Sequence, residues 1–401
     1  MNTYIIDAVR TPIGNFGGTL KDVRTDDLSA LTIRELIKRN SLEPKLIDDV
    51  IIGCANQAGE DNRNIARMSL LLAGLPFSVP GETVNRLCAS GMSAVIQAHR
   101  AIQSGDGDLF ISGGVENMTR GPWVMSKAST AFGRDSQMFD SSFGWRFTNP
   151  KMEELYGTDS MGKTAENLVE KYNISREDQD KFAYNSHMKA YQAQCDGKFK
   201  EEIIAVIIPQ RKKEDIIFSN DEFIKPNTTL ELLAKLRPAF KEKGSVTAGN
   251  SSGLNDGAAA MLIASENALA KHKLTPLARI VSSAVIGVEP KIMGIGPVKA
   301  SLKALEKAKL TLKEIDVIEI NEAFSAQALA CIRELGLKDD DRRINSNGGA
   351  IALGHPLGVS GTRIIHAAAL ELKRSEKKYA LIAMCIGVGQ GYATIIENTQ
   401  I

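Results

Sequence analysis

The sequence lacks several features that mark particular classes of protein. Its 49 basic and 48 acidic side chains leave a formal net charge of +1, so no excess charge favours nucleic acid or an anionic membrane. No apolar run approaches the ~20 residues that a membrane-spanning helix needs. The first residues follow a strand-like pattern, without the basic and then apolar pattern of a signal segment. We therefore expect neither a nucleic-acid nor a membrane partner.

Cysteine is scarce and scattered. The chain has five cysteines, with no CxxC pair among them: Cys54, Cys88, Cys195, Cys331 and Cys385. An odd, dispersed set argues against a disulfide framework and against a zinc site, so we expect no metal. Free cysteines are typical of a reducing compartment, and the sequence therefore predicts a cytoplasmic protein.

Length and patterning favour an α/β protein of more than one domain. The 401 residues are 43% apolar and include 34 glycines, which fits many tight strand–helix connections. Apolar runs alternate with helical patterns over residues 1–120, and this regularity returns near residue 257. We predict a first half at 1–120, completed by about 246–270, an inserted loop domain at 121–245, and a second half at 271–401.

The second half looks like a copy of the first. A shift of 267 positions, the distance from Asp49 to Asp316, lays residues 49–51 on residues 316–318. The same shift aligns further pairs: Gly91 with Gly358, Ser93 with Ser360, and His99 with His366. One offset that fits two separated segments indicates an internal duplication. Because it also places Cys88 on His355, halves of similar fold would bring a cysteine and a histidine face to face.

Cys88 lies where a strand-like run (82–87) meets a helical pattern that starts near Gly91. Free backbone N–H groups and the helix dipole favour an anion at such a corner. We therefore expect the pKa of the Cys88 thiol to fall from about 8.5 to about 7, which corresponds to roughly 2 kcal/mol in favour of the thiolate. A lone cysteine is more often a buried apolar residue, so the case for chemistry depends on the other motifs.

Three further residues have a setting that suits chemistry. His355 lies in a glycine-rich turn and is a candidate base for the Cys88 proton, although a histidine there can also cap a helix. Cys385 follows an apolar strand and precedes Gly387, which is typical of a reactive thiol beside exposed backbone N–H groups. The glycine pattern leads into another strand, so it does not indicate a dinucleotide loop. Asn321 follows a strand and can orient water or an oxyanion.

Together these motifs resemble the thiolases, a family of acetyl-CoA acyltransferases. In chain order they are Asn85-x-x-Cys88-Ala89-Ser90-Gly91, Asn321-Glu322-Ala323-Phe324, Gly354-His355-Pro356 and Cys385-x-Gly387-x-Gly389. The resemblance runs from Asp7 to the C-terminus. It implies a fold of two duplicated βαβαβαββ halves that form a five-layered α-β-α-β-α sandwich, with a loop domain inserted in the first half.

The resemblance also implies a role for each catalytic residue. Cys88 is the nucleophile that carries the acyl group, and His355 activates it. Cys385 moves the proton at the substrate α-carbon. Asn321, through a water, and His355 stabilise the enolate oxygen, while the backbone N–H groups of Cys88 and Gly387 hold the thioester oxyanion. No cofactor is implied, because coenzyme A and acetyl-CoA are substrates.

The resemblance places coenzyme A on the loop domain. The implied substrate-binding residues are Ser252, Lys225, Met161, Met293, Phe324, Phe240 and Ala323. Two positions depart from acetyl-specific relatives, which often have arginine at Lys225 and commonly have histidine at Ser160. The segments 143–150 and 156–161 look like the 3-oxoadipyl-CoA thiolase branch. The family further implies a homodimer or homotetramer and, broadly, a place in fatty acid metabolism.

We therefore predict reversible CoA-dependent cleavage of a 3-oxoacyl-CoA, or the reverse Claisen condensation, by ping-pong acyl transfer through a cysteine thioester. The substrate is acetoacetyl-CoA or another 3-oxoacyl-CoA such as 3-oxoadipyl-CoA. One alternative is a condensing enzyme of the ketoacyl synthase type, but its usual partners for the nucleophile are two histidines, or histidine and asparagine. Another is a non-catalytic lipid carrier of the same fold. Cys385 argues against the first alternative, and the complete set of Cys88, His355 and Cys385 argues against the second.

Overall fold

Fourteen strands and twelve α-helices alternate along the chain in the computed structural model, which describes residues 1–400. The strands are β1 (Thr3–Arg10), β2 (Gly14–Asn15), β3 (Asp49–Gly53), β4 (Gly81–Val84), β5 (Leu109–Asn117), β6 (Trp123–Met125), β7 (Met138–Asp140), β8 (Val206–Ile208), β9 (Ile216–Phe218), β10 (Asn255–Ser265), β11 (Ala278–Gly287), β12 (Val317–Ile320), β13 (Tyr379–Ile386) and β14 (Gln390–Asn398).

Twelve α-helices accompany these strands, and the longest of them, α6, has 20 residues. They are α1 (Thr25–Arg39), α2 (Ile65–Leu72), α3 (Ser90–Ser104), α4 (Pro150–Tyr156), α5 (Met161–Tyr172), α6 (Arg176–Cys195), α7 (Leu230–Ala234), α8 (Glu266–His272), α9 (Gly296–Ala308), α10 (Ser325–Glu334), α11 (Ala350–Leu353) and α12 (Leu357–Ser375). A short 3₁₀ segment, η4 (Pro290–Ile295), precedes α9. Within the described residues, no helix is long and apolar enough to cross a bilayer.

The main sheet repeats one strand order in each half of the chain. Its path is β12-β13-β14-β11-β1-β10-β5-β3-β4, with β2 beside β10. The order β3-β5-β10-β1 in the first half corresponds to β12-β13-β14-β11 in the second. In both halves the first pair is parallel, whereas β10 with β1 and β14 with β11 are antiparallel. The halves join where Tyr4 and Ile5 pair with Arg279 and Ala278.

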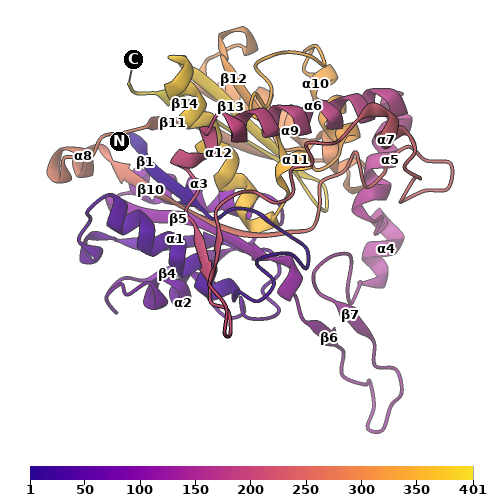
Figure 1. Ribbon diagram of the computed structural model, residues 1–401, viewed down its shortest axis with the longest axis horizontal. Helices are drawn as coiled ribbons and strands as arrows, with labels where there is room; N and C mark the ends of the chain where they lie inside the picture. The colour runs from indigo at the N-terminus through magenta and orange to yellow at the C-terminus, as the bar shows by residue number, and fades with distance from the viewer. Residues whose placement is uncertain (401) are drawn as a thin grey trace.

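Helices α3 and α12 lie between the two halves of the sheet and form the middle layer (Figure 1). The alternation along β10 shows both faces of the first half: Met261 and Ile263 pack toward α3 and α12, while Ala260 and Leu262 pack under α1 and α2. Helices α9 and α10 cover the outer face of the second half. The five-layered α-β-α-β-α sandwich expected from the sequence is therefore confirmed.

The two central helices touch at their N-terminal ends. A side chain at Gly91 would collide with the backbone oxygen of Gly358, and one at Gly361 would collide with the backbone of Met92. Glycine is needed there because the two backbones approach so closely. The first residues of the two helices, 90 and 357, differ by the same 267 positions as the duplicated segments. The duplication therefore brings the two helix-entry corners together, as predicted.

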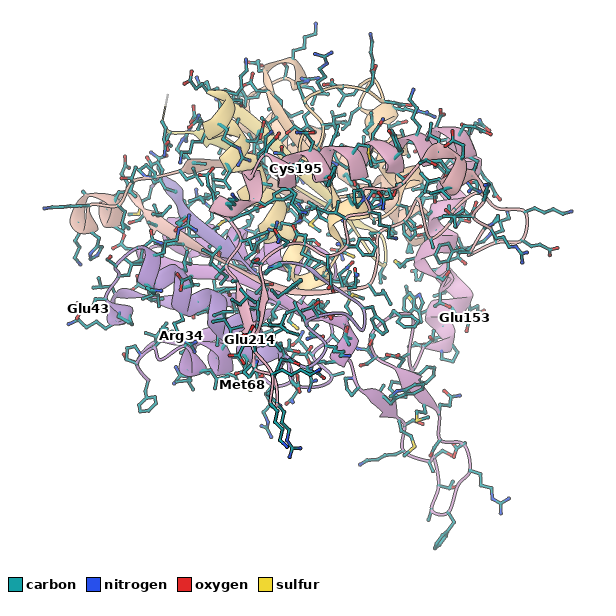
Figure 2. All side chains as sticks on the ribbon, viewed as in Figure 1. Arg34, Glu43, Met68, Glu153, Cys195 and Glu214 are labelled. Atoms are coloured by element: carbon teal, nitrogen blue, oxygen red, sulfur yellow. The ribbon has the colours of Figure 1, made fainter. Side chains whose placement is uncertain are left out.

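Between β5 and β10 the chain leaves the layered body. This stretch contains α4 to α7 and two hairpins, β6–β7 and β8–β9. The β6–β7 hairpin projects from the molecule, and α6 lies over the second half (Figure 1). Figure 2 shows Cys195 at the end of α6, where its side chain is exposed. The domain boundaries at 121, 245 and 271 stay predictions.

Candidate functional site

Cys88 is held by a tight turn between β4 and α3. The strand ends at Val84, earlier than predicted, because the Asn85 side chain accepts a hydrogen bond from the Leu87 N–H (2.9 Å) and turns the chain. The Ser90 hydroxyl accepts from the Arg86 N–H (2.8 Å) and donates to the Leu87 carbonyl (2.7 Å). Leu87 has φ of 47°, a conformation that costs a non-glycine residue about 1–2 kcal/mol. The motif residues Asn85 and Ser90 therefore stabilise a strained turn that presents Cys88.

The Cys88 thiol is partly accessible to solvent but surrounded by protein. Burial raises its pKa to about 11, although the backbone N–H groups of Gly387 and of Cys88 itself act in the opposite direction. The expected fall toward 7 is therefore wrong, because desolvation of the thiolate outweighs the dipoles at the corner. At neutral pH the resting group is a thiol, and it needs a base.

His355 is buried and neutral. Its Nδ1 lies 2.6 Å from the hydroxyl of Ser360, which also donates to the Pro356 carbonyl at 3.0 Å. Because the hydroxyl proton goes to Pro356, we assign the ring proton to Nδ1 and the free lone pair to Nε2. The side-chain amide of Asn321 lies 3.3 Å from that Nε2. Burial, together with the nearby Arg363 charge, lowers the pKa of His355 to about 4, so the ring is unprotonated at neutral pH.

Glu116 on β5 connects the Cys88 and His355 sides of the site. Its carboxylate accepts the N–H of Gly358 in the first turn of α12 (2.9 Å) and the N–H groups of Ala55 and Asn56 after β3 (3.0 Å each). Burial raises the pKa of Glu116 to about 7. Among residues 1–400 no hydrogen bond joins Cys88 directly to His355. Their relative position is therefore set by Glu116 and by the close contact of α3 with α12.

Cys385 lies near the end of β13, opposite Gly391 of β14. It is buried in a small apolar cluster with Met293, Ala323 and Phe324. Burial and the neighbouring Cys88 raise the pKa of Cys385 well above its ordinary value, so this thiol is also protonated at rest. The structure thus places both sulfur atoms in one neighbourhood.

Gly387 lies between the Cys88 turn and Met161. A Cβ on Gly387 would lie 3.2 Å from a methyl of Leu87 and 3.7 Å from the Met161 sulfur. Gly387 therefore leaves the space beside Cys88 open, and its N–H reaches the Cys88 sulfur. Val388, the next residue, has φ of 65°, which is strained for a β-branched side chain. Strain of this kind is often found at functional sites.

The other predicted binding residues fall into two groups, which differ in their contacts. Phe240 packs against Gly162, beside Met161, and meets Phe324 edge-on with ring centroids 6.0 Å apart. The backbone of Ser252 donates to the Ala323 carbonyl at 3.0 Å. Ala323, Phe324 and Met293 pack with Cys385, and Phe240 and Ser252 contact this cluster through Phe324 and Ala323.

Lys225 forms the second group. Its ammonium is 4.9 Å from the centre of the Phe223 ring, and that ring packs on Gly253, next to Ser252. Its backbone N–H donates to His187. Lys225 is therefore connected to the 252–253 backbone through Phe223.

Sequence reasoning gave no role to three residues that position His355. Ser360 was visible in the sequence only as the partner of Ser93 in the duplication. Asn255 accepts the backbone N–H of His355 at 2.9 Å, and it lies 100 residues away in the chain. No sequence pattern around Glu116 indicated a role for it.

One group of side chains has donor atoms suited to a metal. Cys54, Asp61 and Glu116 are buried with their ligand atoms within 4.8 Å of one another. Asp61 already accepts the N–H groups of Gln57 and Gly59, at 3.0 and 2.9 Å, and the Cys54 thiol at 3.4 Å. The group therefore has a structural explanation, because it folds the turn after β3.

Comparison with known proteins identifies the family. Residues 3–267 match the model of the thiolase N-terminal domain, and residues 274–398 match that of the thiolase C-terminal domain. The chain is 57% identical over 398 residues to a beta-ketoadipyl-CoA thiolase of Acinetobacter baylyi, covering 99% of both proteins. It is also 57% identical over 396 residues to a 3-oxoadipyl-CoA/3-oxo-5,6-dehydrosuberyl-CoA thiolase of Escherichia coli, covering 98% of this chain and 99% of the relative.

A solved structure agrees with the sequence matches. The crystal structure of the Bacillus anthracis acetyl-CoA acetyltransferase superposes with a TM-score of 0.92 at 42% identity, covering 99% of this chain and 98% of that one. These full-length matches set aside the ketoacyl synthase and lipid-carrier alternatives. The chain belongs to the thiolase family and is an acyltransferase with thiolase activity.

Proposed function

We propose that this thiolase acts on 3-oxoadipyl-CoA: it cleaves this substrate with coenzyme A to give succinyl-CoA and acetyl-CoA, and it also catalyses the reverse condensation. The observation that carries the proposal is the 57% identity over the full length to relatives named for this substrate. The departures at Ser160 and Lys225 from acetyl-specific relatives support it. The same names argue against the expected place in fatty acid metabolism, because the adipyl substrate is a dicarboxylate.

In the first half-reaction, the Cys88 thiol gives its proton to Nε2 of His355, and the thiolate attacks the C3 carbonyl of the substrate. The C2–C3 bond breaks, and its electron pair forms the enolate of acetyl-CoA. The Cys385 thiol protonates C2, which leaves a succinyl thioester on Cys88 and a thiolate at Cys385. The high pKa of the Cys385 thiol and the basic carbanion are suited to this transfer.

In the second half-reaction, coenzyme A gives its thiol proton to the Cys385 thiolate and attacks the succinyl group. The Cys88 sulfur leaves and recovers its proton from His355. The Gly387 and Cys88 N–H groups stabilise the oxyanion of each tetrahedral intermediate, and their contact with the Cys88 sulfur supports this role. The Asn321 side-chain oxygen has no hydrogen-bond partner within residues 1–400, so it is free to accept from a water at the enolate.

We further propose that coenzyme A binds along Lys225, Ser252 and Phe240 of the loop region, and that the protein is a homodimer or homotetramer. The β6–β7 hairpin supports self-association, because Trp123 and Met125 are about two-thirds exposed on it. The five free cysteines support a cytoplasmic location.

A thiolysis panel tests the substrate. The kcat/KM values for 3-oxoadipyl-CoA, 3-oxohexanoyl-CoA and acetoacetyl-CoA are compared at one coenzyme A concentration, and the products are identified by mass. We expect 3-oxoadipyl-CoA to give the highest value, with succinyl-CoA and acetyl-CoA in equal amounts. Cleavage of acetoacetyl-CoA without cleavage of 3-oxoadipyl-CoA would refute the proposed substrate while leaving the thiolase chemistry intact.

A further inference from the structure

A small hollow opens where the end of α4, the start of α5 and η4 meet Val388. Its walls include Met161, Val388, Trp145, Tyr156 and Lys291. Met161 is the side chain that borders Gly387, and Val388 directly follows Gly387. The hollow is therefore one side chain away from the place where Gly387 meets the Cys88 sulfur.

The hollow is small. Its volume of about 10 Å³ has room for about one water-sized group. A long apolar acyl chain does not fit there without rearrangement, whereas the end of a short acyl chain does.

Lys291 is the basic residue among the side chains that line the hollow within the described chain. No carboxylate of residues 1–400 lies within 4.0 Å of its ammonium. Its stem lies over Gly157, where an added Cβ would come within 2.9 Å of the lysine Cε. The absence of a side chain at Gly157 therefore leaves room for Lys291 in this place.

The backbone of Lys291 is fixed. Its carbonyl accepts the Asn167 side-chain amide at 2.9 Å, and Met293 of the same η4 segment is buried against Cys385. The carboxylate of Asp159, which also borders the hollow, accepts the same Asn167 amide at 2.9 Å. The only negative side chain at the hollow therefore has its own donor, and it leaves the Lys291 ammonium available.

We propose that Lys291 binds the terminal carboxylate of a dicarboxylic acyl group and so selects 3-oxoadipyl-CoA over uncharged 3-oxoacyl-CoA substrates. This inference rests on the proposed function. In the succinyl group on Cys88, three C–C bonds separate the carbonyl carbon from the carboxylate carbon, which is about 4 Å. A carboxylate at that distance from the thioester lies toward Met161, and the flexible lysine stem lets the ammonium approach it from the hollow.

The test compares Lys291→Met with wild type in thiolysis of 3-oxoadipyl-CoA and of 3-oxohexanoyl-CoA, which has the same chain length and no carboxylate. Lys291→Met removes the charge and keeps an apolar stem. We expect kcat/KM for 3-oxoadipyl-CoA to fall about tenfold, as for loss of a charge-assisted hydrogen bond, and kcat/KM for 3-oxohexanoyl-CoA to change less than twofold. Lys291→Arg should restore most of the loss. Lys299→Met, at an exposed position of α9, is the matched control and should change neither value.

The outcomes separate this inference from the function that it rests on. Wild-type cleavage of 3-oxoadipyl-CoA that is unchanged in Lys291→Met overturns the lysine assignment and leaves the proposed substrate in place. An equal fall for both substrates overturns it too, since it shows a structural role. A wild-type enzyme that does not cleave 3-oxoadipyl-CoA overturns both.

Discussion

Replacing Ser360 by alanine should slow acylation of Cys88 roughly five- to hundredfold. The Ser360 hydroxyl is the partner of His355 Nδ1 at 2.6 Å, and both side chains are buried. Without it, the Nδ1–H of the base-competent tautomer has no acceptor, and such a loss costs about 1–3 kcal/mol. The ring then favours the tautomer with its proton on Nε2, which cannot accept the thiol proton. Because about 1.4 kcal/mol is a factor of ten, the penalty translates directly into the expected rate loss.

The assay is a single-turnover measurement of acetyl transfer from acetyl-CoA to Cys88, followed by the mass of the protein. Ser301→Ala is the matched control, because Ser301 is also a buried helical serine but its hydroxyl has no hydrogen-bond partner within residues 1–400. Both variants lose the same oxygen, and both should show similar thermal unfolding within a few degrees. We expect Ser301→Ala to acylate at the wild-type rate.

Two results would refute the reasoning about the tautomer. One is a Ser360→Ala enzyme that acylates as fast as wild type. The other is an equal slowing in Ser301→Ala, which would indicate a general packing effect. The pH profile adds a further check: because the pKa of His355 is lowered to about 4, wild-type acylation should not lose rate through this group between pH 7 and pH 5.

Three further predictions follow from burial and exposure. Acid should destabilise the fold, because burial lowers the pKa of four histidines, to about 4 for three of them and about 3 for the fourth: His99, His187, His355 and His366. Stability is unaffected by these rings above pH 6.5 and falls as the pH drops below it, because the unfolded state then binds protons that the buried rings do not; the loss is roughly 2 kcal/mol per group at pH 5 and roughly 3 kcal/mol near pH 4. Urea unfolding at pH 7 and pH 5 measures the loss, and His99→Gln should reduce it. Cys385→Ala should still acetylate Cys88 but fail to cleave a 3-oxoacyl-CoA, and an equal loss of both steps would contradict separate roles for the two thiols. Prior acetyl-CoA should protect Cys88 from iodoacetamide and leave Cys195 reactive, because Cys195 is exposed away from the site; peptide mass mapping would detect the opposite pattern.

Local patterns in the sequence predicted the elements and the duplication well. Helix α3 begins at Ser90, next to the predicted start near Gly91, and the second half repeats the strand order of the first. Burial periodicity and small residues act over a few neighbours, so one chain is enough to read them. The shift of 267 positions also predicted that Cys88 and His355 come together, because two halves of similar fold have equivalent strand-to-helix corners.

The contacts that position the base could not be predicted in this way. Glu116 bonds to Gly358 across 242 residues, and Asn255 bonds to His355 across 100. No local spacing encodes such a pair, because each partner looks like an ordinary strand or loop residue in its own segment. The end of β4 was also misplaced, since the Asn85 side chain replaces a strand hydrogen bond with a turn.

The Cys88 thiol is less acidic than the sequence predicted, and this difference affects its reactivity. A helix start and two N–H groups stabilise a thiolate by about 0.5–2 kcal/mol, whereas the net rise from 9.0 to about 11 corresponds to about 3 kcal/mol in favour of the thiol. Burial is therefore the larger effect in the resting enzyme. Oxidation and alkylation require the thiolate, so the raised pKa should slow both reactions at Cys88 compared with an unperturbed thiol, without preventing them. In the proposed mechanism, the N–H groups of Gly387 and Cys88 would therefore stabilise charge mainly on the substrate oxygen, and proton transfer to His355 would accompany attack on the carbonyl.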